Sequence, residues 1–174
     1  MSYHRGTVWA VEQATIVFGL RRFGFNARAI DLSRALFDLA RLYPESRIPE
    51  CVGGYARAES ATPGAYPRAN SPQLWNATAF PLVVQTLLGL MPMAPAGVLM
   101  IDPTLPSWLP DVELRDLKVG DARVTLRFAR DDRGRTHWDV VHKTGTLTVV
   151  RQPPPESVTA GPMDRLRAIW ETLV

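Results

Sequence analysis

Glu50 is the carboxylate that the sequence places best for acid–base chemistry. It lies in the segment RIPECVGGYAR (residues 47–57), after the predicted end of a helix and before two adjacent glycines. Glycines of this kind let the backbone approach a ligand closely, and such loops often carry function. We expect Arg47 and Arg57 to lower the pKa of the Glu50 carboxyl, which would keep it ionised as a general base. The alternative is a solvated loop glutamate that is paired with arginine.

The segment YHRGTVWAVEQ (residues 3–13) places aromatic, cationic and hydrogen-bonding groups at the entrance of a predicted helix. Tyr3 and Trp9 offer flat apolar faces for the C–H surface of a sugar ring, and Arg5 offers planar donors for paired hydroxyls. Alternatively, the two aromatic rings belong to the core, and Glu12 is a first-turn carboxylate that the helix dipole favours.

The segment YPRANSPQLW (residues 66–75) combines a polar side chain with a stacking platform. We expect Gln73 and Trp75 in the first turn of a helix, where both can face a cleft. Ser71 followed by Pro72 is also a standard helix start, with serine as the N-cap. The two interpretations are compatible.

Helical spacing of apolar residues predicts three helices in the N-terminal half. The first covers residues 10–23 and ends at Gly24, the second runs from a capping Asn26 to about residue 43, and the third covers 72–90 with a bend at Pro81. Between the second and third helices, residues 44–72 form a long irregular segment, which is typical of a functional or disordered loop.

After residue 91 the apolar pattern changes to a period of two. This alternation, with turn signals at 120–121 and 131–134, predicts a small antiparallel sheet over residues 111–150. Asp131 and Asp132 are interpreted as a turn and not as a metal site. His137 and His142 lie five positions apart, so we expect them on opposite faces of a strand. A proline run then leads to a short terminal helix at 163–173.

Composition argues against several classes of protein. The net charge of +3 comes almost wholly from arginine, and its only basic doublet is Arg21–Arg22, so no nucleic-acid-binding face is expected. Cys51 is the single cysteine, which excludes an internal disulfide and a cysteine-based zinc cluster. No metal or cofactor is predicted. With neither a signal peptide nor an apolar run of about 18 residues, a cytoplasmic protein without a membrane partner is expected.

Taken in order, the segments YHRGTVWAVEQ, RIPECVGGYAR, YPRANSPQLW and FPLVVQTLLGL resemble the C-terminal part of the amylo-α-1,6-glucosidase or glycogen-debranching-like glycoside hydrolases. The tail LPSWLPDVELRDLKVGDARVTLRF is similar to the β-rich region that ends that family. The resemblance extends to about Val150. It implies that Glu50 is the catalytic base that activates water. It also implies a set of sugar-binding residues: Tyr3, Arg5, Trp9, Arg57, Gln73 and Trp75. Glu12, which replaces a residue of the family pattern and keeps a charge, and Tyr55 are further candidates for substrate binding.

The same resemblance implies a mainly α fold with a β-rich C-terminal part. Residues 1–95 would hold about three helices of a six-hairpin (α/α)6 toroid, 96–151 a small antiparallel β region, and 152–174 a proline-rich linker and terminal helix. Inverting hydrolysis also needs a general acid, which such toroids take from an earlier hairpin. We therefore expect a C-terminal fragment that hydrolyses α-glucans or oligosaccharides only with a partner chain carrying the rest of the toroid. The alternatives are a non-catalytic carbohydrate-binding or interaction module and a degenerate gene remnant.

Overall fold

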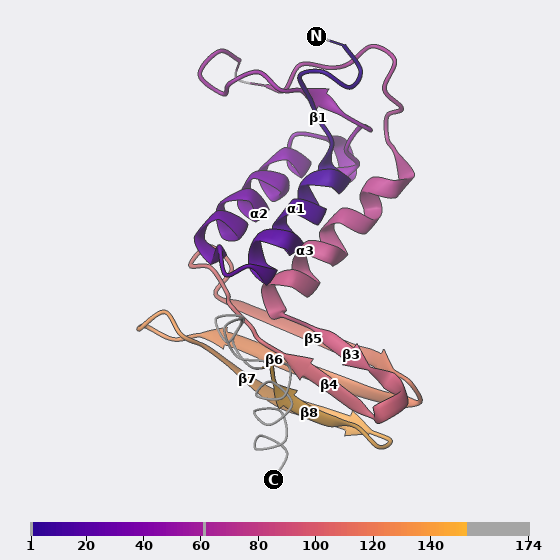
Figure 1. Cartoon of the computed structure of the whole chain (residues 1–174), viewed down its shortest axis with the longest axis vertical. Coiled ribbons are helices and arrows are strands. Elements are labelled where there is room, and N and C mark those ends of the chain that lie inside the picture. Colours follow the sequence, from indigo (N-terminus) through magenta and orange to yellow (C-terminus); the bar gives the residue numbers. More distant parts are fainter. Residues whose placement is uncertain (1, 61, 153–174) are drawn as a thin grey trace. The chain divides into compact units, whose positions relative to one another are not determined.

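The computed structural model of the chain describes residues 2–60 and 62–152 (Figure 1). The chain divides into two compact units, Met1–Val84 and Gln85–Val174, which are called here the N-terminal and C-terminal units. The predicted terminal helix at 163–173 and most of the proposed linker lie outside the described residues. None of the described helices is long and apolar enough to cross a membrane.

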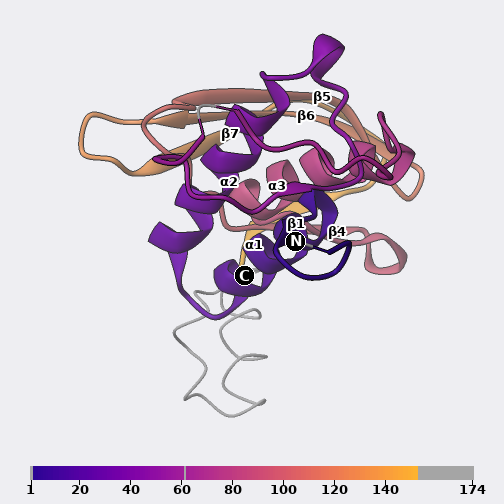
Figure 2. The same cartoon turned by 90° about the horizontal axis from the view of Figure 1, so that it is seen from above.

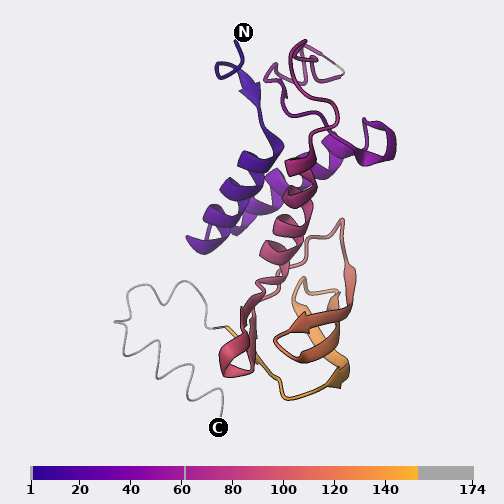
Figure 3. The same ribbon diagram turned by 90° about the vertical axis from the view of Figure 1, so that its right-hand side faces the viewer.

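A helical hairpin forms the centre of the N-terminal unit. Helix α1 (Ala10–Arg22) and helix α2 (Asn26–Ala40) are joined by a tight turn in which Gly24 has φ +81° (Figures 1 and 3). That conformation is open to glycine at little cost, so the predicted helix stop at Gly24 is confirmed. Most of the side chains that the two helices bury are small, which favours a close approach of their backbones. The buried residues include Ala10, Ala14, Val17, Ala29, Ser33, Leu36 and Ala40.

Two predicted helix ends differ from the structure. The second helix ends at Ala40 and not near residue 43, and its N-cap is Phe25. Asn26 is the first helical residue, and its Oδ1 accepts a hydrogen bond of 2.8 Å from Arg21. The amide therefore ties the end of α1 to the start of α2 and does not cap the backbone.

A two-stranded ladder joins distant parts of the N-terminal unit. Strand β1 (Thr7–Val8) pairs antiparallel with β2 (Val52–Gly53). Next to the ladder, the Gly54 N–H donates to the Gly6 carbonyl at 2.7 Å. A Cβ atom on Gly54 would lie 2.8 Å from that oxygen, so the close approach requires glycine at this position. The ladder holds the irregular segment that follows the short 3-10 helix η1 (Pro44–Ser46).

The third predicted helix is divided into two kinds of helix. A 3-10 segment, η2 (Leu74–Thr78), precedes helix α3 (Ala79–Leu88). Pro81 lies in the first turn of α3. The N–H groups of a first turn have no acceptor within the helix, so the N–H that proline lacks costs no hydrogen bond there. The predicted N-cap at Ser71 is wrong, because Gln73 is the N-cap of η2 and its side chain accepts from Leu74 N at 3.2 Å.

In the C-terminal unit a three-stranded meander confirms the period-two pattern. Strands β5 (Asp111–Val119), β6 (Ala122–Arg130) and β7 (Thr136–Thr144) pair antiparallel in that order, side by side in Figure 2. Val124, Leu126 and Phe128 of β6 are buried, as their alternation predicts. Both predicted turn regions connect the strands.

A second sheet was not predicted. Strands β3 (Met91–Met93), β4 (Val98–Ile101) and β8 (Thr148–Arg151) form it in the order β3-β4-β8, and the short 3-10 helix η3 (Ala94–Ala96) connects β3 to β4. Strand β8 pairs parallel with β4, and Val98 lies opposite Thr148. The prediction of one antiparallel sheet up to residue 150 is therefore wrong, because the chain leaves the meander after β7.

The two histidines of β7 lie on one face of the strand and not on opposite faces. His137 pairs with Ala129 and His142 with Thr125, and the register shifts by one residue between those pairs. Ala129 and Thr125 are four residues apart in β6, so their partners share a face. Four strand positions still separate the two histidines by about 13 Å along the strand, which is too far for a shared metal ion.

The predicted fold class is contradicted. Of the described residues, 33% are helical and 30% are in strands, which form three small sheets. This is a mixed α/β architecture, not a mainly α fold built on a partial toroid. The error came from the resemblance, which implied a helical toroid. Within the region assigned to it, residues 52–53 and 91–93 form strands.

Candidate functional site

Glu50 is held on a well-anchored piece of backbone in the N-terminal unit. Its N–H donates to the Asn70 carbonyl at 2.8 Å. The preceding carbonyls are also engaged: Pro49 O accepts from Asn76 Nδ2 at 2.7 Å and Ile48 O from Gln73 N at 3.2 Å. The segment 48–50 is thereby joined to 70–76 at three successive residues. Glu50 is 6% exposed.

Four hydrogen bonds reach the Glu50 carboxylate. Tyr3 Oη donates to Oε1 at 2.6 Å, and Gln73 Nε2 donates to the same oxygen at 3.4 Å. The N–H and Nδ2 of Asn70 donate to Oε2 at 3.2 and 3.4 Å. These donors, led by the Tyr3 hydroxyl, lower the pKa of Glu50 against the opposing effect of burial. Donation to the carboxylate raises the pKa of Tyr3 to about 12, so the phenol keeps its proton at neutral pH.

The predicted role of the arginines is wrong. Arg47 pairs with Glu45 at 3.0 Å, and Arg57 lies 3.7 Å from Asp38. Neither is among the groups that lower the pKa of Glu50. The carboxylate is kept ionised by three uncharged residues, Tyr3, Asn70 and Gln73, which come from two other parts of the chain.

Aromatic rings surround this carboxylate on the side of Tyr3. The rings of His4 and Trp9 are stacked, with centroids 5.5 Å apart and planes at 4°. Trp9 contacts Tyr3 and Trp75 edge to face, at 4.9 and 5.7 Å, and Tyr3 lies 5.4 Å from Tyr66. Edge-to-face contacts of this kind fix the ring orientations. The Trp9 indole is fixed further, because its Nε1 donates to Thr7 Oγ1 at 3.0 Å.

The rings and the carboxylate border a common pocket of about 440 Å³, called here the Glu50 pocket. Trp75 is 42% exposed, so part of its ring is available to a ligand. Glu12 supplies a second carboxylate to the same pocket. The volume falls within the about 300–1,000 Å³ of small-molecule sites. The pocket is lined by Tyr3, His4, Thr7, Trp9, Glu12, Glu50 and Trp75.

The structure brings most of the predicted site residues together, but not all of them. Gln73 joins the site through its hydrogen bond to Glu50. Arg5 is exposed and pairs with Ser2 through backbone hydrogen bonds of 2.9 and 3.0 Å, and it does not line the Glu50 pocket. Tyr55 and Arg57 line a different pocket.

Five contributors were not selected from the sequence, namely His4, Thr7, Tyr66, Asn70 and Asn76. All lie in or next to the segments that were singled out, and four contact Glu50 or Tyr3. The usable signal was the density of aromatic and amide residues in those segments. That signal says nothing about which side chains turn toward the carboxylate.

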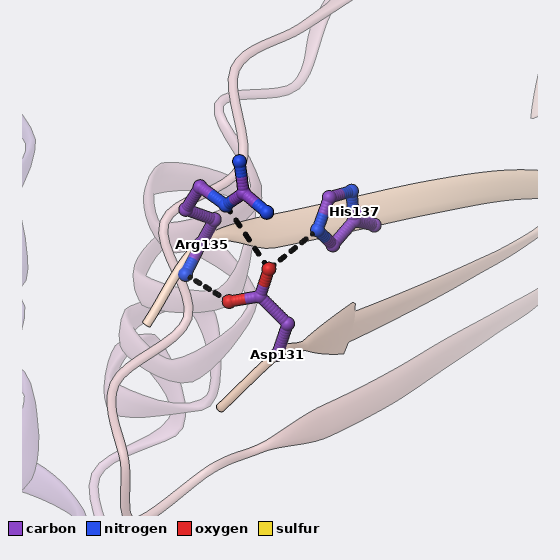
Figure 4. Close-up of polar contacts among 3 residues, drawn as sticks. All are labelled: Asp131, Arg135 and His137. Carbon is purple, nitrogen blue, oxygen red and sulfur yellow. Dashed lines mark hydrogen bonds and ion pairs between the residues drawn. The ribbon is translucent and has the colours of Figure 1, made fainter. Parts of the chain in front are cut away.

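A second polar cluster lies at the turn between β6 and β7 (Figure 4). Asp131 Oδ2 lies 2.9 Å from His137 Nε2 and accepts from Arg135 Nε at 3.1 Å, while Oδ1 accepts from Arg135 N at 2.8 Å. The His137 contact, followed by the Arg135 donors, holds the pKa of the Asp131 carboxyl well below its usual range. Because the Asp131 N–H also bonds to the Arg135 carbonyl at 2.9 Å, the cluster closes the turn, as predicted for this position.

No protein-family model matches the chain, and no curated protein matches it. Within residues 2–60 and 62–152, no group of three or more histidine, cysteine, aspartate or glutamate side chains could hold a metal ion. The candidate site is therefore defined by the Glu50 pocket and its hydrogen bonds.

Proposed function

We propose that the N-terminal unit binds an α-glucan or a related oligosaccharide in the Glu50 pocket, and that Glu50 acts as the general base of an inverting hydrolysis. In this proposal a partner chain supplies the general acid. The observation that carries it is a buried, ionised carboxylate that shares a pocket with exposed aromatic surface. Aromatic faces bind the apolar side of a sugar ring, and carboxylates accept hydrogen bonds from its hydroxyls.

The ionised state of Glu50 favours the role of base over that of acid. A general acid must hold a proton near neutral pH, which needs a raised pKa, whereas the pKa of Glu50 is lowered. Glu12 is the other carboxylate of the pocket and is exposed. It is assigned to hydrogen bonding with substrate hydroxyls.

The test uses α-glucosyl fluoride and the full chain. Fluoride departs without protonation, so its hydrolysis needs the base but no general acid. We expect slow fluoride release with β-glucose as the first product, and we expect Glu50→Gln to abolish it. Glu12→Gln should retain release and raise KM, because it removes a binding group and leaves the base in place.

Glu50→Gln is a suitable variant because the pocket can accommodate it. The glutamine oxygen can accept from Asn70, while its Nε2 faces Tyr3, whose hydroxyl can turn to accept. Gln73 must flip its amide, which removes the bond from Leu74 N that caps η2. Circular dichroism will verify that the fold survives the loss of this one cap.

Non-catalytic carbohydrate binding is the second candidate. It is favoured by the four protein donors that already occupy the Glu50 oxygens, since each one weakens the carboxylate as a base. Under this alternative no fluoride is released, yet maltotriose binds and Trp75→Ala weakens its binding at least tenfold. If neither fluoride release nor Trp75-dependent binding is observed, both candidates are wrong.

A further inference from the structure

The N-terminal unit contains a second pocket, and the β1–β2 ladder forms part of its wall. Successive strand residues point to opposite faces. Thr7 of β1 lines the Glu50 pocket, while Val8 and its ladder partner Val52 line the second one. The second pocket, of about 370 Å³, is called here the Val8 pocket.

The Val8 pocket is mainly apolar. Helix α2 contributes leucines at positions 32, 36 and 39, and the irregular segment contributes Tyr55 and Pro63. Tyr55 is 58% exposed, and Leu42 at the end of the wall is 51% exposed. Exposed side chains of this size around a concave surface are characteristic of ligand sites, and the volume is in the range of pockets for small organic molecules, about 300–1,000 Å³.

The polar groups of the pocket include one charge of each sign. Asp38 of α2 and Arg57 both line it, and their closest charged atoms are 3.7 Å apart. That separation exceeds the usual hydrogen-bond length of about 2.7–3.2 Å, so the two groups can still bond to a third. A neutral hydroxyl can donate to the carboxylate and accept from the guanidinium at once. A charged head would pair with one group and repel the other.

From this arrangement the geometry points to a second ligand site, independent of Glu50, that binds small neutral amphiphiles. The apolar body lies against Val8, Val52 and the α2 leucines, and a hydroxyl end lies between Asp38 and Arg57. Neither the carbohydrate site nor its chemistry is needed for this binding.

Three probes test this ligand site: 4-phenylbutan-1-ol, 4-phenylbutyrate and 4-phenylbutylamine. They share a phenylalkyl chain and differ in the charge of the head group. Their affinities for the full chain are measured by ligand-observed NMR titration. The alcohol is expected to bind in the millimolar range or tighter. Both charged probes are expected to bind at least tenfold more weakly. Absence of alcohol binding at 10 mM, about ten times a Kd of about 1 mM, would overturn the proposal.

Substitution of Ala35 tests whether the alcohol binds in the Val8 pocket. Ala35 lines it from α2, so Ala35→Phe should fill the space and reduce alcohol affinity at least tenfold. Ala27 is an exposed alanine of the same helix, and Ala27→Phe is the matched control with unchanged affinity. Unchanged binding in a folded Ala35→Phe variant would show that the probe lies elsewhere.

Substitution of the charge pair tests the position of the head group and leaves the apolar wall of the pocket unchanged. Asp38→Asn should improve binding of the butyrate at least threefold, because it removes the repelling carboxylate. Arg57→Gln should do the same for the amine. Both side chains are partly exposed, so these variants are expected to fold. Unchanged affinity of the butyrate for Asp38→Asn and of the amine for Arg57→Gln would contradict the assigned position of the head group.

Discussion

Alanine at position 54 should loosen the contact that holds the β1 segment against the irregular segment. The new Cβ would lie 2.8 Å from the Gly6 oxygen and 3.5 Å from Val8 Cγ2. Reaching an ordinary C···O contact of about 3.3 Å requires a shift of about 0.5 Å. The obstacle is backbone, and the same oxygen accepts the 2.7 Å hydrogen bond from Gly54 N, so the shift stretches that bond.

The change in the free energy of unfolding caused by Gly54→Ala follows from two opposing effects. Overpacking costs about 1–3 kcal/mol, whereas replacing glycine by alanine stabilises by about 0.4–1 kcal/mol through the unfolded chain. Gly54→Ala should therefore lower the free energy of unfolding by about 1–2 kcal/mol. Gly19 is the matched control, because it lies within α1 and its added Cβ meets nothing within 4 Å. Gly19→Ala should raise stability by about 0.5–1 kcal/mol.

Urea unfolding, followed by circular dichroism in the helical band, measures both variants. Gly6 belongs to the segment that carries Tyr3 and Trp9, so Gly54→Ala should also weaken maltotriose binding, and Gly19→Ala should not. The reasoning is refuted if Gly54→Ala is as stable as the parent protein, or if the two alanines act in the same direction.

Three further predictions concern the acid dependence of the site and the core of the C-terminal unit. Because the folded pKa of Glu50 is lowered, its stabilising contribution is present above its unfolded pKa and is lost as the pH falls through the folded pKa. Tyr3→Phe should thus cost more stability at pH 7 than at pH 2, as measured by urea unfolding at each pH; an equal cost at both would exclude the Tyr3 bond as the cause. Gly89→Ala should destabilise by about 2–5 kcal/mol in calorimetry. Its φ is +61° and its Cβ would meet the Asp102 oxygen at 2.5 Å, so a melting temperature like that of the parent would contradict this packing. Phe128→Ala should cost about 3–5 kcal/mol in the same measurement, because the ring is fully buried, and a loss below 1 kcal/mol would show that it is not.

Elements with a strong local pattern were predictable from the sequence. Helix α1 begins and ends within a residue of its predicted limits, because apolar spacing and Gly24 are both local signals. The meander follows from strict alternation in β6 and from its two turns. Its position before two glycines singled out Glu50, and the structure places it with three of the predicted aromatic side chains. Its catalytic role stays a prediction.

Contacts between distant residues were not predictable. The parallel pairing of β4 with β8 joins residues about fifty positions apart, and neither strand is long enough to show a period. The register shift in β7 changed the face of a histidine without leaving a mark in the apolar pattern.

The candidate site shows the same division. The sequence by itself determined that a carboxylate, several aromatic residues and two glycines occur in three short segments. Only the tertiary structure decided that Tyr3, 47 residues away, donates to Glu50, and that the arginines nearest in sequence pair elsewhere. The reason is physical: a carboxylate buried by folding is stabilised by whichever donors the packed backbone brings within about 3 Å, and sequence distance does not enter that selection.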